Sequence, residues 1–420
     1  MPRNSSNISR ISRIPALSLE LETQLNREIV DVAIIGAGPY GLSLAAHLQG
    51  GSKSYRIFGE PMRSWTHHMP KGMSLKSEGF ASCLYDPRDE FPLSVYCADK
   101  GIPYADVAIP VKLDTFIAYG MEFQKRYVPN LEKTQVTAVS RKDDHFVLTT
   151  TGGDVAHARQ VVVAAGIAHF SHLPDFLKSL GDGVSHSAAH NDLSSFKGKK
   201  VGVVGGGSSA VDIAVILLQQ GIDVQMIART SQLLFHDPPK DPRSMWESIK
   251  APRSGLGTGW RSRLCTDIPM VFYSLPQSLR HRAVARHLGP APCWFTREAV
   301  VGKLPMHLGV EPTGAKRIGN GVQLTIRQPD GATTELEFDH LIAATGYKVS
   351  LSRLGFLDSG IQANLRKAAE TPILDRYFQS SVPGLYFVGI TAANNFGPML
   401  RFAYGAKFAA NRLSQELLHS

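Results

Sequence analysis

Cysteine is scarce in this chain, and its few cysteines lie far apart. Four occur among 420 residues, namely Cys83, Cys97, Cys265 and Cys293, and no two of them form a Cys-x-x-Cys motif. This spacing argues against a dithiol redox centre and against a structural zinc site, and no other metal-ligand pattern stands out, so we expect no metal. So few cysteines suit a reducing, cytoplasmic compartment.

Long apolar runs are also missing. None approaches the ~20 residues that a membrane-spanning helix needs, so we expect no membrane span. With 43% hydrophobic and 19% charged residues, the composition is that of a globular protein, and the length predicts two or more domains.

Acidic residues are outnumbered, and the formal net charge is +9. Between Arg229 and Arg317 there are 14 Lys and Arg residues against 6 Asp and Glu. These cations are scattered and accompany no nucleic-acid-binding motif, so we expect no nucleic-acid partner. A domain that receives a polyphosphate cofactor explains the excess more simply.

Residues 1–29 differ from the rest of the chain. Arg3, Arg10 and Arg13 occur there among several serines, without an acid in the first 19 residues. Such a stretch resembles an organelle transit peptide weakly. The alternative that we favour is a flexible N-terminal extension, or one that contacts another subunit.

A dinucleotide-binding fingerprint begins at the first apolar strand, residues 30–35. Gly36, Gly38 and Gly41 follow it in a Gly-x-Gly-x-x-Gly pattern, and residues 42–48 continue with helical periodicity. The first glycine allows a tight turn, the second lets a pyrophosphate approach, and the third permits close packing of helix on strand. The helix N-terminus faces the phosphates. The predicted contacts are Gly36, Gly38, Pro39, Tyr40 and Gly41.

A second fingerprint follows the apolar strand 201–204 and enters a helix over 211–219. It has the form Gly-x-Gly-x-x-Ala, a variant found where a nucleotide is held less closely. Its predicted contacts are Gly205, Gly207, Ser208, Ser209 and Ala210.

The residues that end the next strands distinguish the two sites. Glu60 ends the strand 54–60, and a carboxylate there accepts hydrogen bonds from a ribose without a 2′-phosphate, as in FAD. Arg229 ends the strand 223–228 and can pair with a 2′-phosphate, which favours NADPH over NADH. The alternatives are a solvated turn residue for Glu60 and a cap of the sheet edge for Arg229.

Two similar segments, 137–166 and 322–347, each contain a hairpin followed by an apolar strand. Together with the two fingerprints they predict an α/β fold of two Rossmann-like dinucleotide-binding domains, the second inserted into the first. We expect an FAD domain over 30–195 and 339–420 and an NADPH domain over 196–338. The segment 236–308 is rich in Pro, Arg and aromatic residues, and we interpret it as a lid or, alternatively, as a contact in a homo-oligomer.

The C-terminal part completes the first domain. An apolar strand over 383–390 precedes residues 394–402, which we expect to open the last helix, with Pro398 in its first turn. That helix N-terminus would favour reduced, anionic flavin. The further predicted contacts are Val136, Gly166, Gly389, Pro398 and Met399 for FAD, and Thr345 and Gly346 on the NADPH side.

The stretch 65–77, rich in aromatic, Met and Gly residues, resembles the flavin-dependent N-hydroxylating monooxygenases (the lysine and ornithine N-hydroxylases). The resemblance implies that Trp65 and Met69 line the flavin. It also implies that Lys76 binds a substrate carboxylate or the nicotinamide side. The motif 343–347, Ala-Ala-Thr-Gly-Tyr, is similar to one in flavin-containing and Baeyer–Villiger monooxygenases.

The resemblance implies FAD and NADPH as cofactors and O2 with a small molecule as substrates. The flavin would form a C4a-hydroperoxide and oxygenate the substrate, most simply by N-hydroxylation of an amine or amino acid, which requires no catalytic side chain. Two alternatives stay open: an NADPH-driven flavin oxidoreductase (diaphorase) without oxygenation, and a non-catalytic flavin-binding regulator.

Overall fold

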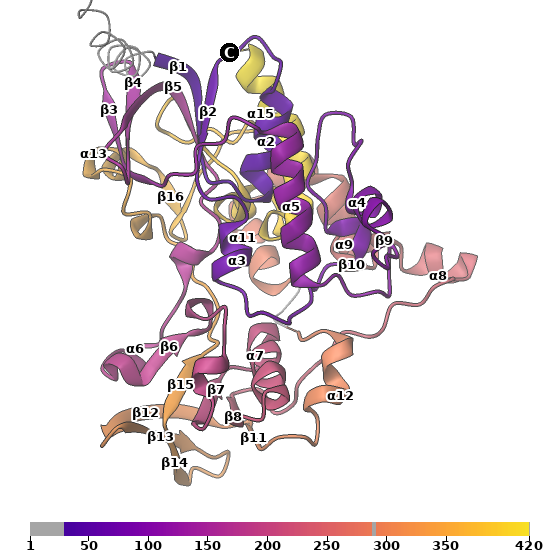
Figure 1. The fold of residues 1–420 in the computed structure, drawn as a ribbon, viewed down its shortest axis with the longest axis vertical. Coiled ribbons are helices and arrows are strands. Elements are labelled where there is room, and N and C mark those ends of the chain that lie inside the picture. Colours follow the sequence, from indigo (N-terminus) through magenta and orange to yellow (C-terminus); the bar gives the residue numbers. More distant parts are fainter. Residues whose placement is uncertain (1–28, 288–290, 420) are drawn as a thin grey trace, which may run out of the picture.

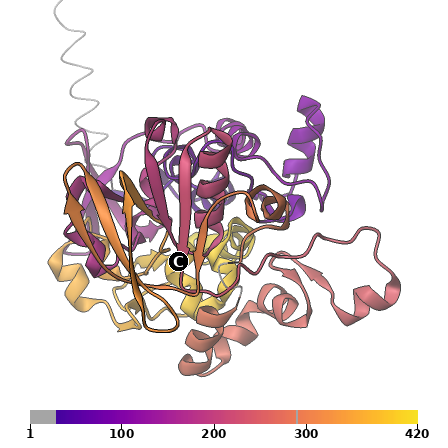
Figure 2. The same ribbon diagram turned by 90° about the horizontal axis from the view of Figure 1, so that it is seen from below.

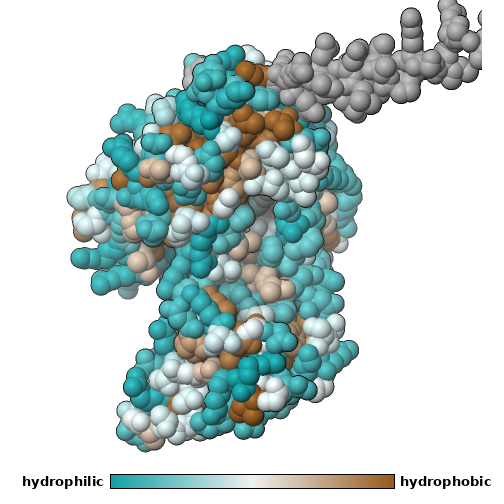
Figure 3. All heavy atoms as spheres, turned by 90° about the vertical axis from the view of Figure 1, so that its left-hand side faces the viewer, coloured by the Kyte–Doolittle hydropathy of each residue, from teal (hydrophilic) through white to brown (hydrophobic). Residues whose placement is uncertain are grey.

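The computed structural model describes residues 29–287 and 291–419. It has two lobes, one above the other in Figure 1, and Figure 3 shows that the molecule narrows between them. The predicted N-terminal extension lies outside the described residues except for Ile29, which begins the first strand. Among the described residues, no helix has the length and apolarity needed to cross a bilayer.

The upper lobe is built on a six-stranded sheet. In it, β2, β1, β5 and β18 are parallel, and β3–β4–β5 form an antiparallel meander. The first half of β5 pairs with β4, while its end, 161–163, pairs with β18. The strands are β1 (Ile29–Ile35), β2 (Tyr55–Phe58), β3 (Val136–Lys142), β4 (His145–Thr150), β5 (Val155–Val163) and β18 (Leu385–Phe387).

Helices α2 and α15 pack against each other beside this sheet, and α5 packs on α2 (Figure 1). Most of the side chains of α2 are buried, as is expected for a helix that follows a nucleotide-binding turn and lies between a sheet and another helix. The elements here are α2 (Pro39–Leu48), α3 (Arg63–His67), α4 (Leu93–Lys100), α5 (Leu113–Tyr127), α13 (Ser359–Asn364), β16 (Lys367–Ala368), β17 (Thr371–Pro372), α14 (Ala393–Phe396) and α15 (Ala406–His419).

The lower lobe has three layers around a parallel sheet of order β11-β8-β7-β15-β6. Because successive strand residues face opposite sides, Val201 and Val203 pack with α7, while Val204 packs with the antiparallel meander β12–β14. The elements are α6 (Asp175–Lys178), β6 (Val184–His186), β7 (Lys200–Val204), α7 (Ser208–Gln219), β8 (Asp223–Ala228), α12 (Arg297–Val300), β11 (Met306–Leu308), β12 (Glu311–Ile318), β13 (Gly321–Arg327), β14 (Thr333–Phe338) and β15 (His340–Ala343).

The domain boundaries differ from the predicted ones. β6 and β15 pair within the lower sheet, although the boundaries at 195 and 339 assign both strands to the upper, FAD domain. The lower lobe therefore begins before β6 and ends after β15. The reason is that β15, the strand that follows the second hairpin, forms its backbone hydrogen bonds with β7 of the same lobe.

The segment 236–308 does not stay with the lower lobe. Its helices α10 and α11 contact α14 of the upper lobe, and α9 contacts the turn η9 (Pro398–Arg401). In Figure 2 the arm that carries α8 projects away from the rest of the molecule. The elements are α8 (Met245–Lys250), β9 (Arg253–Ser254), β10 (Gly257–Thr258), α9 (Trp260–Asp267), α10 (Pro269–Ser274) and α11 (Gln277–Arg286).

The prediction that the last helix opens at Pro398 is wrong. Pro398 starts the single 3-10 turn η9, and α15 begins eight residues later, at Ala406. The Phe402 backbone is extended and interrupts the helical path between them.

Candidate functional site

The first fingerprint forms a tight turn between β1 and α2. Gly36 has φ +112°, where only glycine is unstrained, and a Cβ at Gly41 would collide with the Gly36 carbonyl oxygen. Gly38 differs, because a Cβ there would meet nothing within 4 Å. Open space at this glycine is what the approach of a pyrophosphate to the backbone requires.

Tyr40 ties this turn to the C-terminal segment. Its hydroxyl donates a hydrogen bond of 2.8 Å to the Phe402 carbonyl oxygen, and burial raises the pKa of the phenol well above its usual value. Its ring lies against Gly389, whose φ is +74°. The prediction that Gly389, Pro398 and Met399 contact FAD stays a prediction, and all three are buried near this junction.

Other predicted FAD residues lie around the same end of the upper sheet. Glu60, after β2, pairs with Arg63 and lies 3.6 Å from the His67 imidazole. Val136 begins β3 and is half-buried, and Gly166, with φ +72°, is exposed just beyond β5. Glu60 and Gly166 fit the edge of a parallel sheet where nucleotides bind, since they follow the carboxyl ends of β2 and β5, whereas Val136 starts a strand of the antiparallel meander.

Trp65 and Met69 do not line the large cleft described below. The Trp65 ring packs edge-on against Phe116 of α5, with 4.7 Å between ring centroids. The Met69 carbonyl accepts a 2.7 Å hydrogen bond from the Asn191 amide, which links the upper lobe to the chain entering the lower one. Their proposed contact with the flavin stays a prediction.

The second fingerprint repeats the geometry of the first. Gly205 has φ +149°, and a Cβ there would collide with the Ala344 carbonyl oxygen. Ala210 is fully buried, Ser208 is buried, and Ser209 is exposed at the start of α7. Arg229 ends β8, is exposed, and makes no hydrogen bond or ion pair with the described part of the chain. It is therefore free to meet a phosphate.

Thr345 and Gly346 follow β15 at the same edge of the lower sheet. The Thr345 hydroxyl donates to the His172 carbonyl, and the Gly346 carbonyl lies 2.9 Å from the His186 imidazole. Burial lowers the pKa of His186, so this side chain stays neutral near pH 7. The two hydrogen bonds fix the turn beside the second fingerprint.

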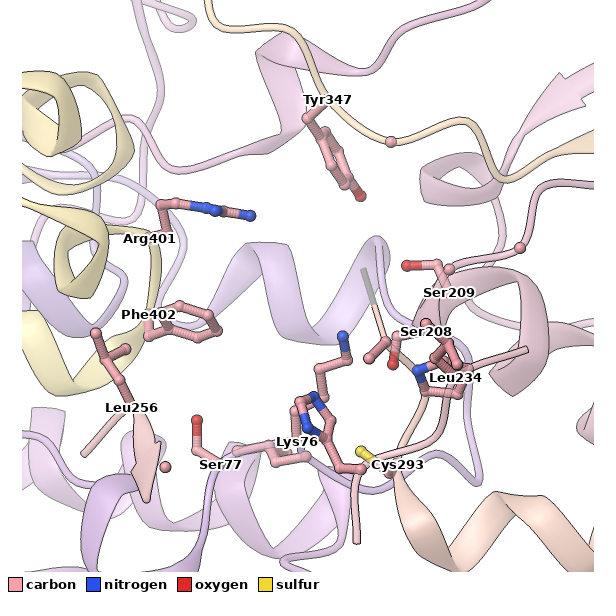
Figure 4. Close-up of a pocket in the computed structure, with 18 of the residues that line it drawn as sticks. Lys76, Ser77, Ser208, Ser209, Leu234, Leu256, Cys293, Tyr347, Arg401 and Phe402 are labelled. Atoms are coloured by element: carbon pink, nitrogen blue, oxygen red, sulfur yellow. The ribbon is translucent and has the colours of Figure 1, made fainter. Parts of the chain in front are cut away.

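A cleft of about 2230 Å³ runs between the lobes. It is lined by residues of the second fingerprint, by Arg229 and Thr345, and by side chains from the upper lobe and the 236–308 segment (Figure 4). Among the side chains that point into it are those of Lys76, Arg401 and Tyr347. The cleft therefore joins the second nucleotide site to the upper lobe.

Lys76 and Arg401 point into this cleft, and neither makes an ion pair with a carboxylate of the described residues. The Arg401 guanidinium contacts the carbonyl oxygens of Val284 and His287, both at 3.3 Å. Water reaches Lys76, yet the cleft walls surround its ammonium group and lower its pKa. Burial lowers the pKa of Arg401 as well. Both side chains are exposed to the cleft, and two cations that face the same cleft can bind an anionic group.

Two buried ionisable groups interact electrostatically with Lys76. Asp212, in α7, is buried, and this burial raises the pKa of its carboxyl to about 7, although Lys76 acts against the rise. Cys293 is buried too, and burial raises the pKa of its thiol to about 12. The thiol is therefore protonated near pH 7, whereas the carboxyl titrates there.

Sequence reasoning did not single out Asp212, Cys293 or Arg401 as site residues. The sequence contains a feature that could have pointed to Asp212, since it is the one charged residue in the apolar helix α7. No such sequence feature points to Cys293 or Arg401, because these residues reach the cleft only when the 236–308 segment and η9 fold onto it.

These features define a class of protein. Two parallel sheets each carry a glycine fingerprint at their carboxyl ends, and the second fingerprint opens into a cleft between the lobes. The structure is that of a flavoprotein fold with two dinucleotide-binding domains.

Solved structures with the same fold include an ornithine N-hydroxylase and a cadaverine monooxygenase. An ornithine N-hydroxylase from Kutzneria sp. 744, with reduced FAD, NADP+ and L-ornithine, matches with a TM-score of 0.73 and 17% identity, over 93% of this chain and 99% of that one. A cadaverine monooxygenase from Erwinia amylovora, bound to FAD, matches with a TM-score of 0.71 and 17% identity, over 94% and 95%. At such identity the likeness shows the fold alone.

The sequence comparisons show other relatives. The pyridine nucleotide-disulphide oxidoreductase family matches residues 114–247. A ferredoxin–NADP reductase from Shouchella clausii is 28% identical over 222 residues, which cover 52% of this chain and 59% of that protein. The chain thus spans little more than half the length of the curated relatives that match it first.

The predicted fold class and the predicted resemblance to N-hydroxylating monooxygenases are confirmed by the fold. The predicted cofactor pair agrees with the ligands of the Kutzneria structure, and these three relatives are all oxidoreductases.

Proposed function

We propose that the protein is an FAD- and NADPH-dependent monooxygenase that N-hydroxylates a small primary amine carrying an acidic group, such as an amino acid. One observation supports this most: Lys76 and Arg401 face the same cleft as the second fingerprint. Overall, RNH2, O2, NADPH and H+ give RNHOH, H2O and NADP+. The N-hydroxylases of the same fold support the reaction class.

The residues of the first fingerprint fit FAD. Gly38 leaves open space for the pyrophosphate, while Gly36 and Gly41 pack too closely to accept a side chain. Glu60 would accept hydrogen bonds from the ribose if it exchanged its pairing with Arg63. FAD, when bound, supplies the chemistry that takes hydride from NADPH and activates O2.

The chain itself has two tasks in this proposal. Arg229 holds the 2′-phosphate of NADPH, and Lys76 with Arg401 holds the acidic group of the substrate, which leaves its amine free to face the flavin. Helices α9–α11 pack on the upper lobe beside the cleft and limit the access of water. The proposed reaction needs no side chain that acts as a nucleophile.

The test measures NADPH oxidation, O2 uptake and hydroxylamine formation by the FAD-loaded chain with a panel of amines and amino acids. We expect a transient flavin absorbance near ~380 nm on mixing with O2 and hydroxylamine formation with carboxylate-bearing amines. Lys76→Met should raise the KM of such a substrate by about tenfold or more, the range for losing one charge-assisted contact. It should leave anaerobic flavin reduction by NADPH in place. Flavin reduction that never yields hydroxylamine would contradict the proposal.

A reductase without oxygenation is the second candidate, and the ferredoxin–NADP reductase relative favours it. In that case NADPH would reduce the flavin, electrons would pass to an added protein or dye acceptor, and amines would not alter NADPH oxidation. O2 uptake that depends on the amine distinguishes the monooxygenase from the reductase.

A further inference from the structure

An exposed apolar surface lies on the segment that crosses to the upper lobe. Of the fourteen large hydrophobic side chains exposed in the described part of the chain, ten lie between residues 234 and 279. Proteins of this kind usually expose such residues singly, so their concentration marks a binding surface. We call the following set the α8–α11 apolar face: Met245, Trp246, Ile249, Trp260, Leu264, Ile268, Val271, Leu275 and Leu279.

The apolar face continues across three short helices, α9, α10 and α11, and across the residues that join them. From Trp260 to Leu279 the exposed members follow at steps of four, four, three, four and four residues, and they are 39–56% exposed. Residues between them, such as Ser262 and Phe272, are buried against the lobe. In α9 the buried side chains are the polar Ser262 and Thr266, while Trp260 and Leu264 are exposed, which reverses the pattern of an ordinary surface helix.

The α8 arm belongs to the same face. The Trp260 indole donates a 3.0 Å hydrogen bond to the Ile249 carbonyl at the end of α8, which holds the arm beside α9. Met245 and Trp246, at 76% and 78% exposure, are the most exposed of the large hydrophobic side chains. A capping box at Ser244 fixes the start of this short helix.

The charges around the face are cationic. Its acids are neutralised locally, by the ion pairs Asp241–Arg253, Glu247–Lys240 and Asp267–Arg263. The exposed cations without a partner among the described residues are Lys250, Arg261, Arg282 and Arg286. A second copy of the face would bring like charges together, whereas an anionic surface would neutralise them.

We propose that the α8–α11 apolar face docks on the surface of a lipid bilayer that carries anionic headgroups. Trp, Met and Leu side chains insert at the boundary between headgroups and acyl chains, and the flanking Lys and Arg side chains contact the headgroups. The helices lie in the interface and do not cross it. Because Lys250 and Ser262 also line the cleft, docking places the cleft beside the bilayer.

The test is cosedimentation of the full FAD-loaded chain with vesicles of phosphatidylcholine alone or mixed with phosphatidylserine. We expect binding to the mixed vesicles, with a blue shift of the tryptophan fluorescence and a loss of binding at high salt. The double variant Met245→Ser/Trp246→Ser should lose about tenfold or more of the affinity, as should Arg282→Glu/Arg286→Glu. None of these four residues lines the cleft.

Matched controls are Ile109→Ser and Lys316→Glu, which change an exposed isoleucine and an exposed lysine elsewhere. They should bind vesicles as the wild type does, and all variants should keep its thermal midpoint. Three results would overturn the proposal: no binding to either vesicle, equal losses in the controls, or a lipid-free dimer that Met245→Ser/Trp246→Ser dissociates. The last would assign the face to self-association.

Discussion

At the scale of single residues, the glycines of the first fingerprint do different work. Gly41 is needed for folding, because a Cβ there meets the backbone of Gly36, whereas Gly38 borders open space. Gly38 has φ −87° and ψ −170°, a conformation that alanine also adopts. The two positions therefore separate the requirement for folding from the requirement for FAD.

We predict opposite behaviour for two alanine variants. Without FAD, the free energy of unfolding of Gly38→Ala should lie within about 1 kcal/mol of the wild-type value. The variant should nevertheless bind FAD much more weakly, because its Cβ occupies the space for the pyrophosphate. Gly41→Ala should lose about 3 kcal/mol or more of stability from overpacking. Thermal unfolding and FAD titration measure both, and normal FAD affinity in Gly38→Ala would contradict the assignment.

Arg229 provides the prediction for cofactor choice. Arg229→Ala should raise the KM for NADPH by about tenfold to a hundredfold, as expected for losing a charged hydrogen bond, and leave the KM for NADH nearly unchanged. The readout is anaerobic flavin reduction by each nucleotide. Lys316→Ala, an exposed cation of the same lobe outside the cleft, is the control. Equal effects on the two nucleotides would place the 2′-phosphate elsewhere.

Asp212 makes stability depend on pH. Burial raises the pKa of its carboxyl from 3.8 to about 7, so between these values the folded chain holds a proton that the unfolded chain releases. Stability from this group is therefore highest below pH 4, falls as the pH rises, and levels off above pH 7. Asp212→Asn should be more stable than the wild type at pH 8 by at least about 1 kcal/mol.

The measurement is urea unfolding of both proteins from pH 4 to pH 8. The gain in Asp212→Asn should vanish toward pH 4, where the native carboxyl is protonated. In Lys76→Met the decline should extend to higher pH, because Lys76 lowers the pKa of Asp212. If the free energy of unfolding depended on pH in the same way in the wild type and in Asp212→Asn, ionisation of the Asp212 carboxyl would not destabilise the folded chain.

At the scale of elements, Tyr273 of α10 joins this helix to the upper lobe, through its ring and through a 3.3 Å hydrogen bond from its hydroxyl to the Leu374 carbonyl. The Tyr273 ring stacks on Phe396 of α14 at 5.2 Å and 20°, and the neighbouring Arg280 bonds to the Asn395 carbonyl at 3.2 Å. Because Phe396 is fully buried in the upper core, this stacking joins the 236–308 segment to the core of the upper lobe.

Tyr273→Ala should loosen α9–α11 while lowering global stability by only about 2 kcal/mol or less, since aromatic stacking adds little beyond the buried area. Trypsin should cleave within 261–286 faster than in the wild type. Tyr377→Ala is a matched control, a half-buried tyrosine under the Arg412 guanidinium at 4.8 Å but away from this segment. Unchanged cleavage in Tyr273→Ala would show that other contacts hold the helices.

Sequence periodicity predicted most of the elements near the fingerprints. The predicted strand 223–228 is β8 itself, because its apolar residues Val224 and Met226–Ala228 form a short run that is typical of a buried parallel strand. It did not predict β12, whose exposed residues alternate weakly, or the start of α15. There Gly397 and the extended Phe402 interrupt the chain for reasons that lie in the packing against α9 and Tyr40.

At the scale of the whole molecule, two separate sheets imply two independent ligand effects. Saturating FAD and NADP+ should each raise the free energy of unfolding, by about 2.7 kcal/mol at a hundredfold excess over Kd, and the two gains should add where unfolding stays cooperative. Gly38→Ala should lose the gain from FAD and keep that from NADP+. Thermal shift titrations measure this, and a loss of both gains would show that the two sites are coupled.

The sequence by itself determined the two nucleotide folds, since the strand, glycine turn and helix are local patterns that can be recognised within about 20 residues. It also predicted Lys76 and Arg229 as cations that contact ligands, and both line the cleft, although their ligand contacts stay a prediction. Only the tertiary structure decided which strands share a sheet, because β6 and β15 choose partners far along the chain. It alone brought Arg401 and Cys293 to the cleft and left the apolar side chains of α8–α11 exposed, since both depend on the docking of a distant segment.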